Sequence, residues 1–110
     1  MYVIVWEFRV RDEATQIFIE RYGSAGDWAR LFGKAEGFVG TELTRSVKDP
    51  QVFYTLDAWK SKVSYDDFHR VFADEYRAMD KGFEGLTEHE RLIGTMTSEQ
   101  TRMPVNEEGT

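Results

Sequence analysis

The chain has no cysteine among its 110 residues. It therefore has no disulfide framework, no thiolate zinc or iron–sulfur site and no thiol nucleophile. Basic residues are also few, because 14 Lys and Arg stand against 20 Asp and Glu and leave a net charge of -6. Attraction to phosphate requires a clustered basic face, so this charge balance argues against nucleic-acid binding and favours neutral or cationic partners.

Long hydrophobic runs are absent as well. The apolar N-terminal stretch MYVIVWEFRV is far shorter than the roughly 20 residues that span a bilayer. It also lacks the basic start and the small-residue cleavage site of a signal peptide. We therefore expect no membrane association and a cytoplasmic location.

Length and hydrophobic content favour a single domain with a substantial core. A chain of 110 residues buries roughly two thirds of its extended surface when it folds, and a second core is not expected. Hydrophobic residues make up 41% of the chain and aromatic residues 15%, which is enough to fill that core. We assign residues 1–97 to the domain, and residues 98–110, which are polar and lack periodicity, to a C-terminal tail.

Residue periodicity and turn signals predict the secondary structure. Runs of β-branched and aromatic residues predict strands over residues 2–10, 38–46, 52–59 and 87–96. Apolar residues at helical spacing predict helices over about 13–22, a short one that ends at Gly33 or Gly37, and a long one over about 64–81. The predicted N-caps are Asp12, Ser24 and Ser64, and the predicted end of the long helix is Gly82.

The order of these elements predicts an α+β fold of the ferredoxin-like type. In this β-α-β-β-α-β arrangement, a four-stranded antiparallel sheet carries its helices on one face. The other face also carries apolar residues. By alternation along the strands, one set is Val3, Val5, Phe53, Thr55, Trp59 and Ile93, and the opposite set is Ile4, Trp6, Tyr54, Leu56 and Leu92. An exposed apolar face marks an interface, so we predict a homodimer built sheet to sheet.

An aromatic stripe runs along the long predicted helix. At about 100° per residue, one side of this helix gathers rings and a methionine: Tyr65, Phe68, Phe72, Tyr76 and Met79. His69 shares this stripe, and its ordinary pKa of about 6.5 would let it exchange a proton near neutral pH. The stripe can be core packing or the wall of a cavity, and both interpretations stay open.

The first strand, the hairpin and the segment DAWKSKVSYDDFHRVF resemble the antibiotic biosynthesis monooxygenase family. The resemblance covers about residues 2–97, and its most specific part runs from Trp59 at the end of the third strand to Phe68 in the aromatic helix. It implies a dimeric α/β barrel with a pocket between sheet and helices. It also implies cofactor-independent oxygenation of an aromatic or quinol-like molecule.

Under this resemblance His69 is the candidate catalytic base. The candidate substrate-binding residues are Trp6, Trp28, Phe32, Tyr54, Tyr65, Phe68, Phe72 and Tyr76. The tyrosines would orient a phenolic ligand, and the other rings would enclose it. No cofactor is expected. No metal is expected either, because His69 and His89 lie on separate elements and no spacing typical of metal ligands is present.

Two other functions stay open. One is a non-catalytic dimeric module that binds a small apolar ligand or stabilises an assembly, with the same rings serving as core. The other is isomerase or haem-linked chemistry. The haem-degrading branch of the family uses an Asn, a Trp and a His at positions that fall near Phe8, Phe68 and Tyr76 here, which disfavours haem, although His69 lies upstream on the same helix.

Overall fold

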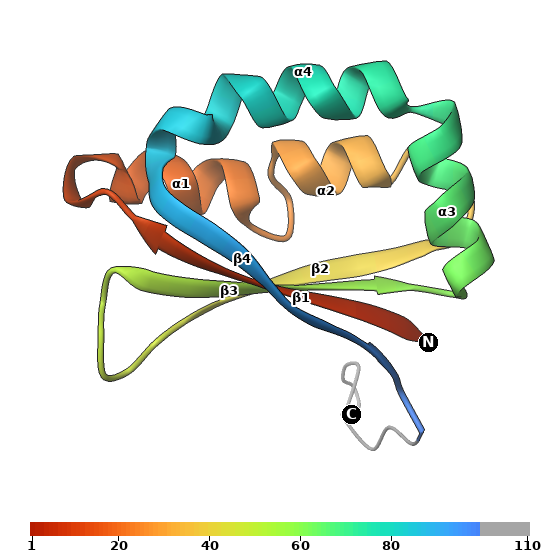
Figure 1. The fold of residues 1–110 in the computed structure, drawn as a ribbon, viewed down its shortest axis with the longest axis horizontal. Coiled ribbons are helices and arrows are strands. Elements are labelled where there is room, and N and C mark those ends of the chain that lie inside the picture. Colours follow the sequence, from red (N-terminus) through yellow and green to blue (C-terminus); the bar gives the residue numbers. More distant parts are fainter. Residues whose placement is uncertain (100–110) are drawn as a thin grey trace.

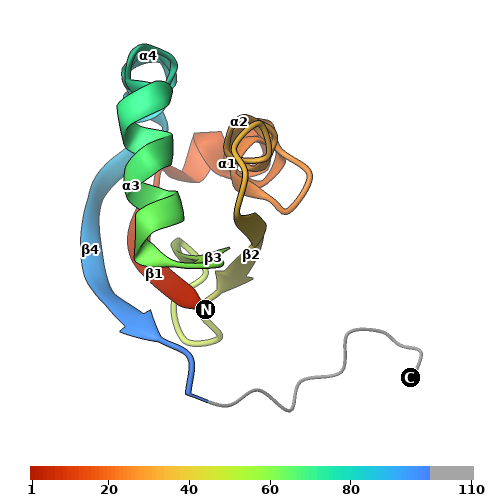
Figure 2. The ribbon, with the colours of Figure 1, turned by 90° about the vertical axis from the view of Figure 1, so that its right-hand side faces the viewer.

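Four strands form one antiparallel sheet in the spatial order β2-β3-β1-β4, and all helices lie on one side of it (Figures 1 and 2). The structure is a computed structural model that describes residues 1–99. Its elements are β1 (Tyr2–Val10), η1 (Asp12–Ala14), α1 (Thr15–Tyr22), α2 (Asp27–Phe32), β2 (Phe38–Arg45), β3 (Val52–Trp59), α3 (Lys62–Val71), α4 (Ala73–Phe83), η2 (Glu84–Leu86) and β4 (Thr87–Thr97). The predicted ferredoxin-like α+β fold is confirmed. Within residues 1–99, no helix has the length and apolar character needed to cross a membrane.

The two central strands, β1 and β3, determine which side chains face the helices. Phe8 pairs with Phe53, and Tyr2 pairs with Trp59, and residues paired in this way share a face of the sheet. Ile4, Phe53 and Trp59 are all at most 2% exposed and belong to the core under the helices.

The predicted grouping of the strand residues was wrong for β3. Phe53, Thr55 and Trp59 face the helices together with Ile4, whereas Tyr54 and Leu56 lie on the outer face with Val3 and Val5. Alternation within each strand was predicted correctly. The face that two strands share depends on their register, however, and a shift of one residue exchanges the faces.

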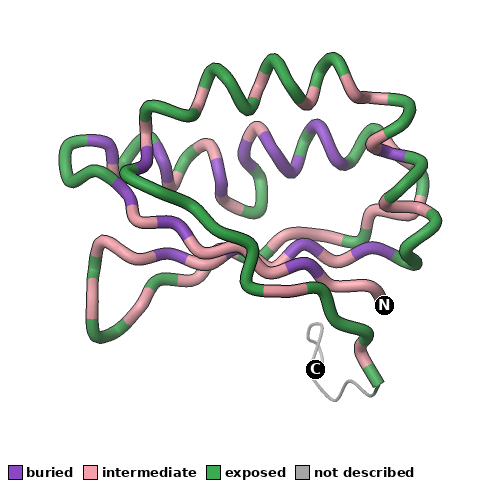
Figure 3. Tube along the Cα trace, in the orientation of Figure 1, coloured by how far each residue is buried: buried purple, intermediate pink, exposed green. Residues whose placement is uncertain are grey.

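Aromatic rings make up most of the core. Phe18 stacks on Tyr22 with ring centroids 4.1 Å apart, and Phe32 meets Phe68 edge to face at 5.1 Å. Phe68 also lies 5.4 Å from Trp59, so this pair ties α3 to the end of β3. Buried positions lie along α1, α2, β1 and β3, and α4 has none, which leaves α4 as the outermost helix (Figure 3).

The helix starts differ from the predicted caps. Ser61, not Ser64, caps α3, because the Ser61 Oγ accepts a hydrogen bond from the Ser64 backbone N–H at 3.2 Å. Asp12 opens the short η1 turn without a side-chain cap, and α2 begins at Asp27 after Gly26 instead of at Ser24. A Cβ atom at Gly26 would lie 2.4 Å from the carbonyl oxygen of Glu20, so only glycine fits where α2 starts against α1.

The long helix predicted over residues 64–81 is two helices. They meet at Phe72, whose φ of -109° and ψ of 27° depart from helical values. The Phe72 N–H still donates to Phe68, and the Tyr76 N–H donates to Phe72, so the chain bends without a loop. Figure 1 shows α3 and α4 running in different directions. The second helix continues through Gly82 to Phe83, one residue past its predicted end.

The core packing of Phe68 yields a stability test. Phe68 is 1% exposed, and Val47 is fully exposed on the hairpin turn. We expect Phe68→Ala to lower the free energy of unfolding by about 3–5 kcal/mol, because it leaves a void beside Trp59. The control Val47→Ala should change it by less than about 0.5 kcal/mol. Urea unfolding measures both values, and a loss below about 1 kcal/mol for Phe68→Ala would contradict the core assignment.

Candidate functional site

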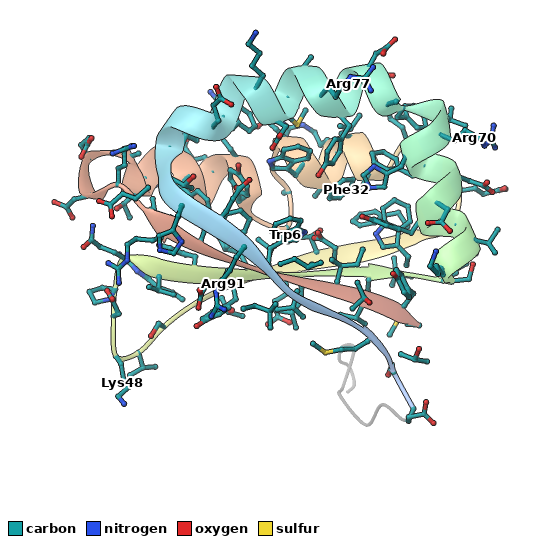
Figure 4. The ribbon with its side chains drawn as sticks, in the orientation of Figure 1. Trp6, Phe32, Lys48, Arg70, Arg77 and Arg91 are labelled. Carbon is teal, nitrogen blue, oxygen red and sulfur yellow. The ribbon has the colours of Figure 1, made fainter. Side chains whose placement is uncertain are left out.

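A cavity of about 130 Å³ lies between the helices and the helix-facing side of the sheet. Every strand contributes to its wall. The lining residues are Trp6, Phe8, Tyr22, Trp28, Phe32, Thr41, Thr55, Asp57, Tyr76, Asp80 and Glu90. Trp6 and Phe32, from the sheet and the helix layer, lie between the two layers in Figure 4. The core of this fold therefore encloses a hollow with aromatic walls and several carboxyl groups.

Asp57 is the buried acid of this cavity. It lies in β3 between Thr55 and Trp59 on the helix-facing side, and it is only 8% exposed. The Thr41 hydroxyl donates a hydrogen bond to the Asp57 Oδ1 at 2.7 Å. Burial raises the pKa of Asp57 to about 6, and the Thr41 hydrogen bond only partly opposes this rise. Asp57 can therefore exchange a proton near neutral pH inside an aromatic cavity.

Sequence reasoning missed Asp57. The available signal was a single acid in the strand VFYTLDAW, at the same alternation as Phe53 and Trp59. The predicted grouping placed Phe53, Thr55 and Trp59 on the face opposite Ile4 and Trp6, and it gave this acid no role. The observed β1–β3 register reverses that placement and brings Asp57 into the cavity.

Neutral hydrogen-bonding groups complete the buried part of the wall. Burial raises the pKa of Tyr76 to about 12 and raises the pKa of Tyr22 still further, so both stay neutral phenols at physiological pH. The Trp28 Nε1–H is buried next to the Tyr22 hydroxyl, where it acts to lower the pKa of Tyr22, but burial outweighs this effect.

The exposed side of the cavity is acidic. Asp80 from α4 and Glu90 from β4 both line it and both remain exposed to solvent. Partial burial raises the pKa of Glu90, and the charge of Asp80 raises it further, which indicates that the two carboxyl groups lie near each other. In the described part of the chain, no group of three or more His, Asp or Glu side chains is arranged to hold a metal ion.

His69 lies beside the cavity without lining it. Its ring meets the Tyr65 ring at 4.5 Å and the Tyr76 ring at 4.7 Å, both edge to face. Burial lowers the pKa of His69 below its usual value, so the imidazole is neutral near pH 7. Tyr76 lines the cavity, and His69 therefore contacts the cavity wall from behind.

The structure brings together part of the candidate substrate-binding set. Trp6, Trp28, Phe32 and Tyr76 all line the cavity. The other aromatic side chains pack elsewhere. Tyr65 packs against Trp59, Phe68 is buried in the core, and Phe72 stacks on Phe68.

Tyr54 lies on the opposite face of the sheet. Its hydroxyl donates to the Glu7 Oε2 at 2.8 Å, and the Arg91 Nε donates to the Glu7 Oε1 at 2.7 Å. Tyr54 therefore belongs to a polar group on the outer face and cannot reach a ligand in the cavity of the same chain.

Comparisons with known proteins agree with this architecture. The sequence profile of the family described as "Antibiotic biosynthesis monooxygenase" matches residues 1–81. No curated protein matches the chain. A variant of SnoaB, a cofactor-independent oxygenase from Streptomyces nogalater, superposes with a TM-score of 0.70 at 17% identity, over 92% of this chain and 95% of that chain. A protein from Nitrosomonas europaea named for the same monooxygenases gives a TM-score of 0.66 at 15% identity, over 91% of this chain and all of that chain. Identities this low show a shared fold.

The raised pKa of Asp57 makes stability depend on pH. The unfolded chain releases this proton near pH 3.8, and the folded protein holds it to about pH 6. The contribution of this proton to the free energy of unfolding is therefore fully present below about pH 3.8 and is lost as pH rises through about 6. Asp57→Asn removes this dependence. As pH rises from about 3.8 to about 6, we expect the free energy of unfolding of the variant to rise relative to that of the native protein. The rise should reach up to about 3 kcal/mol, at ~1.4 kcal/mol per pKa unit.

Urea unfolding at several pH values, followed by tryptophan fluorescence, measures this difference. Asp74→Asn is the matched control, because the Asp74 side chain is 95% exposed at the surface of α4. Its stability relative to the native protein should not show the rise of about 3 kcal/mol expected for Asp57→Asn. The same constant difference for Asp57→Asn would contradict the buried, neutral-favouring environment of Asp57.

Proposed function

The chain belongs to the antibiotic biosynthesis monooxygenase family, and from this membership we propose that it is a cofactor-independent oxygenase of a small aromatic or quinol-like molecule. The observation that carries the proposal is the aromatic cavity with the buried Asp57 carboxyl in its wall. A substrate-driven oxygenation needs a base to make an electron-rich anion and a dry site to protect the intermediate. The Asp57 carboxylate would act as the base, and the aromatic walls would exclude water from the buried part of the cavity.

The proposed reaction converts a phenol with a free ring position into a quinone. The base removes the phenolic proton, and the anion gives electrons to dioxygen, so a carbon–oxygen bond forms at that ring carbon. The resulting peroxide loses the ring hydrogen, and its oxygen–oxygen bond breaks. One oxygen atom stays on the ring, and the other leaves as water with the phenolic proton and the ring hydrogen. The substrate supplies all the electrons, so the balance is phenol plus dioxygen to quinone plus water.

Asp57 is the proposed proton acceptor. It faces the cavity directly, and a base with a pKa of about 6 is ionised at neutral pH yet retains useful basicity. His69 is the alternative base proposed from the sequence. It is neutral near pH 7, but Tyr76 separates it from the cavity, so it could accept a proton only from a substrate that displaces or passes Tyr76.

The remaining aromatic residues divide between two proposed roles. Trp6, Trp28, Phe32 and Tyr76 would contact the substrate ring, and the neutral Tyr76 hydroxyl would orient it. Tyr65, Phe68 and Phe72 would act indirectly, because they hold α3 and the start of α4 in place over the sheet. On this account, their substitution changes activity through stability.

We also propose that the protein is a homodimer joined through the outer sheet face. No helix of the described residues covers this face (Figure 2). It presents Val3, Val5 and Leu56, which are half-buried, and Met96, which is 47% exposed. Members of the family are typically dimers. A second copy would bury this apolar face and leave the cavity, on the other side of the sheet, separate from the interface.

Oxygen uptake with a panel of quinols and polyphenols tests the proposed activity. We expect Asp57→Asn to lower the rate by about 10²-fold or more, the range that general-base loss produces. Asp74→Asn, the exposed match, should keep the native rate. His69→Ala should keep most of it.

Each other result is informative. A native rate in Asp57→Asn combined with a large loss in His69→Ala would transfer the role of base to His69. Ligand binding without oxygen uptake for any compound would instead favour a non-catalytic binding module.

Sedimentation velocity tests the proposed dimer. Leu56→Glu places a charge on the outer sheet face, where burial in an interface would be costly, and should yield a monomer. Val63→Glu is the control, because Val63 is 67% exposed on α3, and this helix belongs to the layer on the other side of the sheet (Figure 2). It should sediment like the native protein. A native protein that sediments as a monomer would contradict the proposed interface.

A further inference from the structure

Among the residues that the structure describes, the carboxyl groups that line the cavity have no basic partner. Some acids elsewhere are paired: the Arg9 guanidinium meets Asp49 at 2.5 Å, and the Lys62 ammonium meets Asp66 at 2.8 Å. Within residues 1–99, Asp57, Asp80 and Glu90 form no ion pair, and none of the described lining residues is basic. The cavity therefore has an uncompensated negative potential.

The buried end of the cavity offers a hydrogen-bond acceptor for a hydroxyl. Asp57 is 8% exposed, and the Thr41 hydroxyl donates to its Oδ1 at 2.7 Å. In the described part of the chain, no hydrogen bond reaches the other oxygen, Oδ2. A phenolic hydroxyl can donate to that oxygen, so it complements the buried carboxylate.

The cavity's volume limits the guest to a single ring. An engineered protein cavity of about 150 Å³ holds benzene, and the volume here is about 130 Å³. A single ring therefore fills the buried part, and any substituent must extend toward the exposed side. That side carries Asp80 and Glu90. An ammonium group there would meet two carboxylates next to the rings of Trp28 and Tyr76, which also attract cations.

We propose that the ligand of this cavity is a phenolic amine: one phenol ring whose hydroxyl meets Asp57 and whose ammonium group meets Asp80 and Glu90. This inference rests on the proposed function only in using the same cavity. The same arrangement disfavours a phenol that carries a carboxylate, because its charge would meet carboxylates of like sign. It also disfavours fused multi-ring compounds, which exceed the buried volume.

Isothermal titration calorimetry with three matched probes tests the inference. Tyramine, 4-ethylphenol and 3-(4-hydroxyphenyl)propanoate share a phenol ring and a two-carbon arm, and they are cationic, neutral and anionic at about pH 7.5. We expect tyramine to bind at least about tenfold more tightly than the propanoate, with 4-ethylphenol between them. Equal affinities, tighter binding of the propanoate, or no binding of any probe would overturn the inference.

A double variant, Asp80→Asn with Glu90→Gln, assigns the preference to the exposed side. It should bring the tyramine and propanoate affinities within about threefold of each other and leave 4-ethylphenol binding unchanged. Asp74→Asn, outside the cavity on α4, should keep the native preference. A native preference in the double variant would overturn the assignment.

Oxygen uptake separates this inference from the proposed activity. Selective tyramine binding without oxygen uptake for any phenol would leave the ligand class standing and remove the oxygenase proposal. Oxygen uptake with quinols, combined with no preference for tyramine over the propanoate, would leave the oxygenase proposal standing and remove the ligand class.

Discussion

The antiparallel register of β1 with β3 is the constraint on which the rest of the structure depends. It pairs Phe8 with Phe53 and Ile4 with Asp57, and so puts a carboxyl group into the same layer as the core rings. The helices close over that layer. Asp57 is therefore buried because of the strand register, and this burial raises its pKa. A shift of one residue would place Tyr54 under the helices and Asp57 on the outer face.

The same register leaves most of the helix layer well packed but puts a cavity beside Asp57, which lowers stability where chemistry could take place. Around most of the helix layer, rings meet rings, as between Phe32 and Phe68, and the core is filled. Near Asp57 the filling stops, and a hollow with carboxyl groups in its wall remains. A hollow of this kind reduces stability, because packing contacts are lost and a carboxyl is dehydrated. Functional sites are where proteins keep such unfavourable features.

Much of the fold could be predicted from the sequence, because strand alternation, helical spacing and turn residues are local signals. The strand at Val52–Trp59 and the helix end at Gly33 show this. The bend at Phe72 could not be predicted, since the backbone hydrogen bonds continue through it and the aromatic spacing is unbroken. Part of the cavity wall could be predicted. Trp28 and Tyr76 carry a helical signal, whereas Asp57 depends on register, which arises from pairing between distant segments.

The central claim is that Asp57 is a buried carboxyl group facing an aromatic cavity. Carbon-13 NMR of the aspartate carboxyl groups during a pH titration tests it most directly, with Asp57→Asn used to assign the signal. We expect the Asp57 signal to titrate near pH 6. A signal that titrates near 3.8, the value of a solvated aspartate, would contradict it.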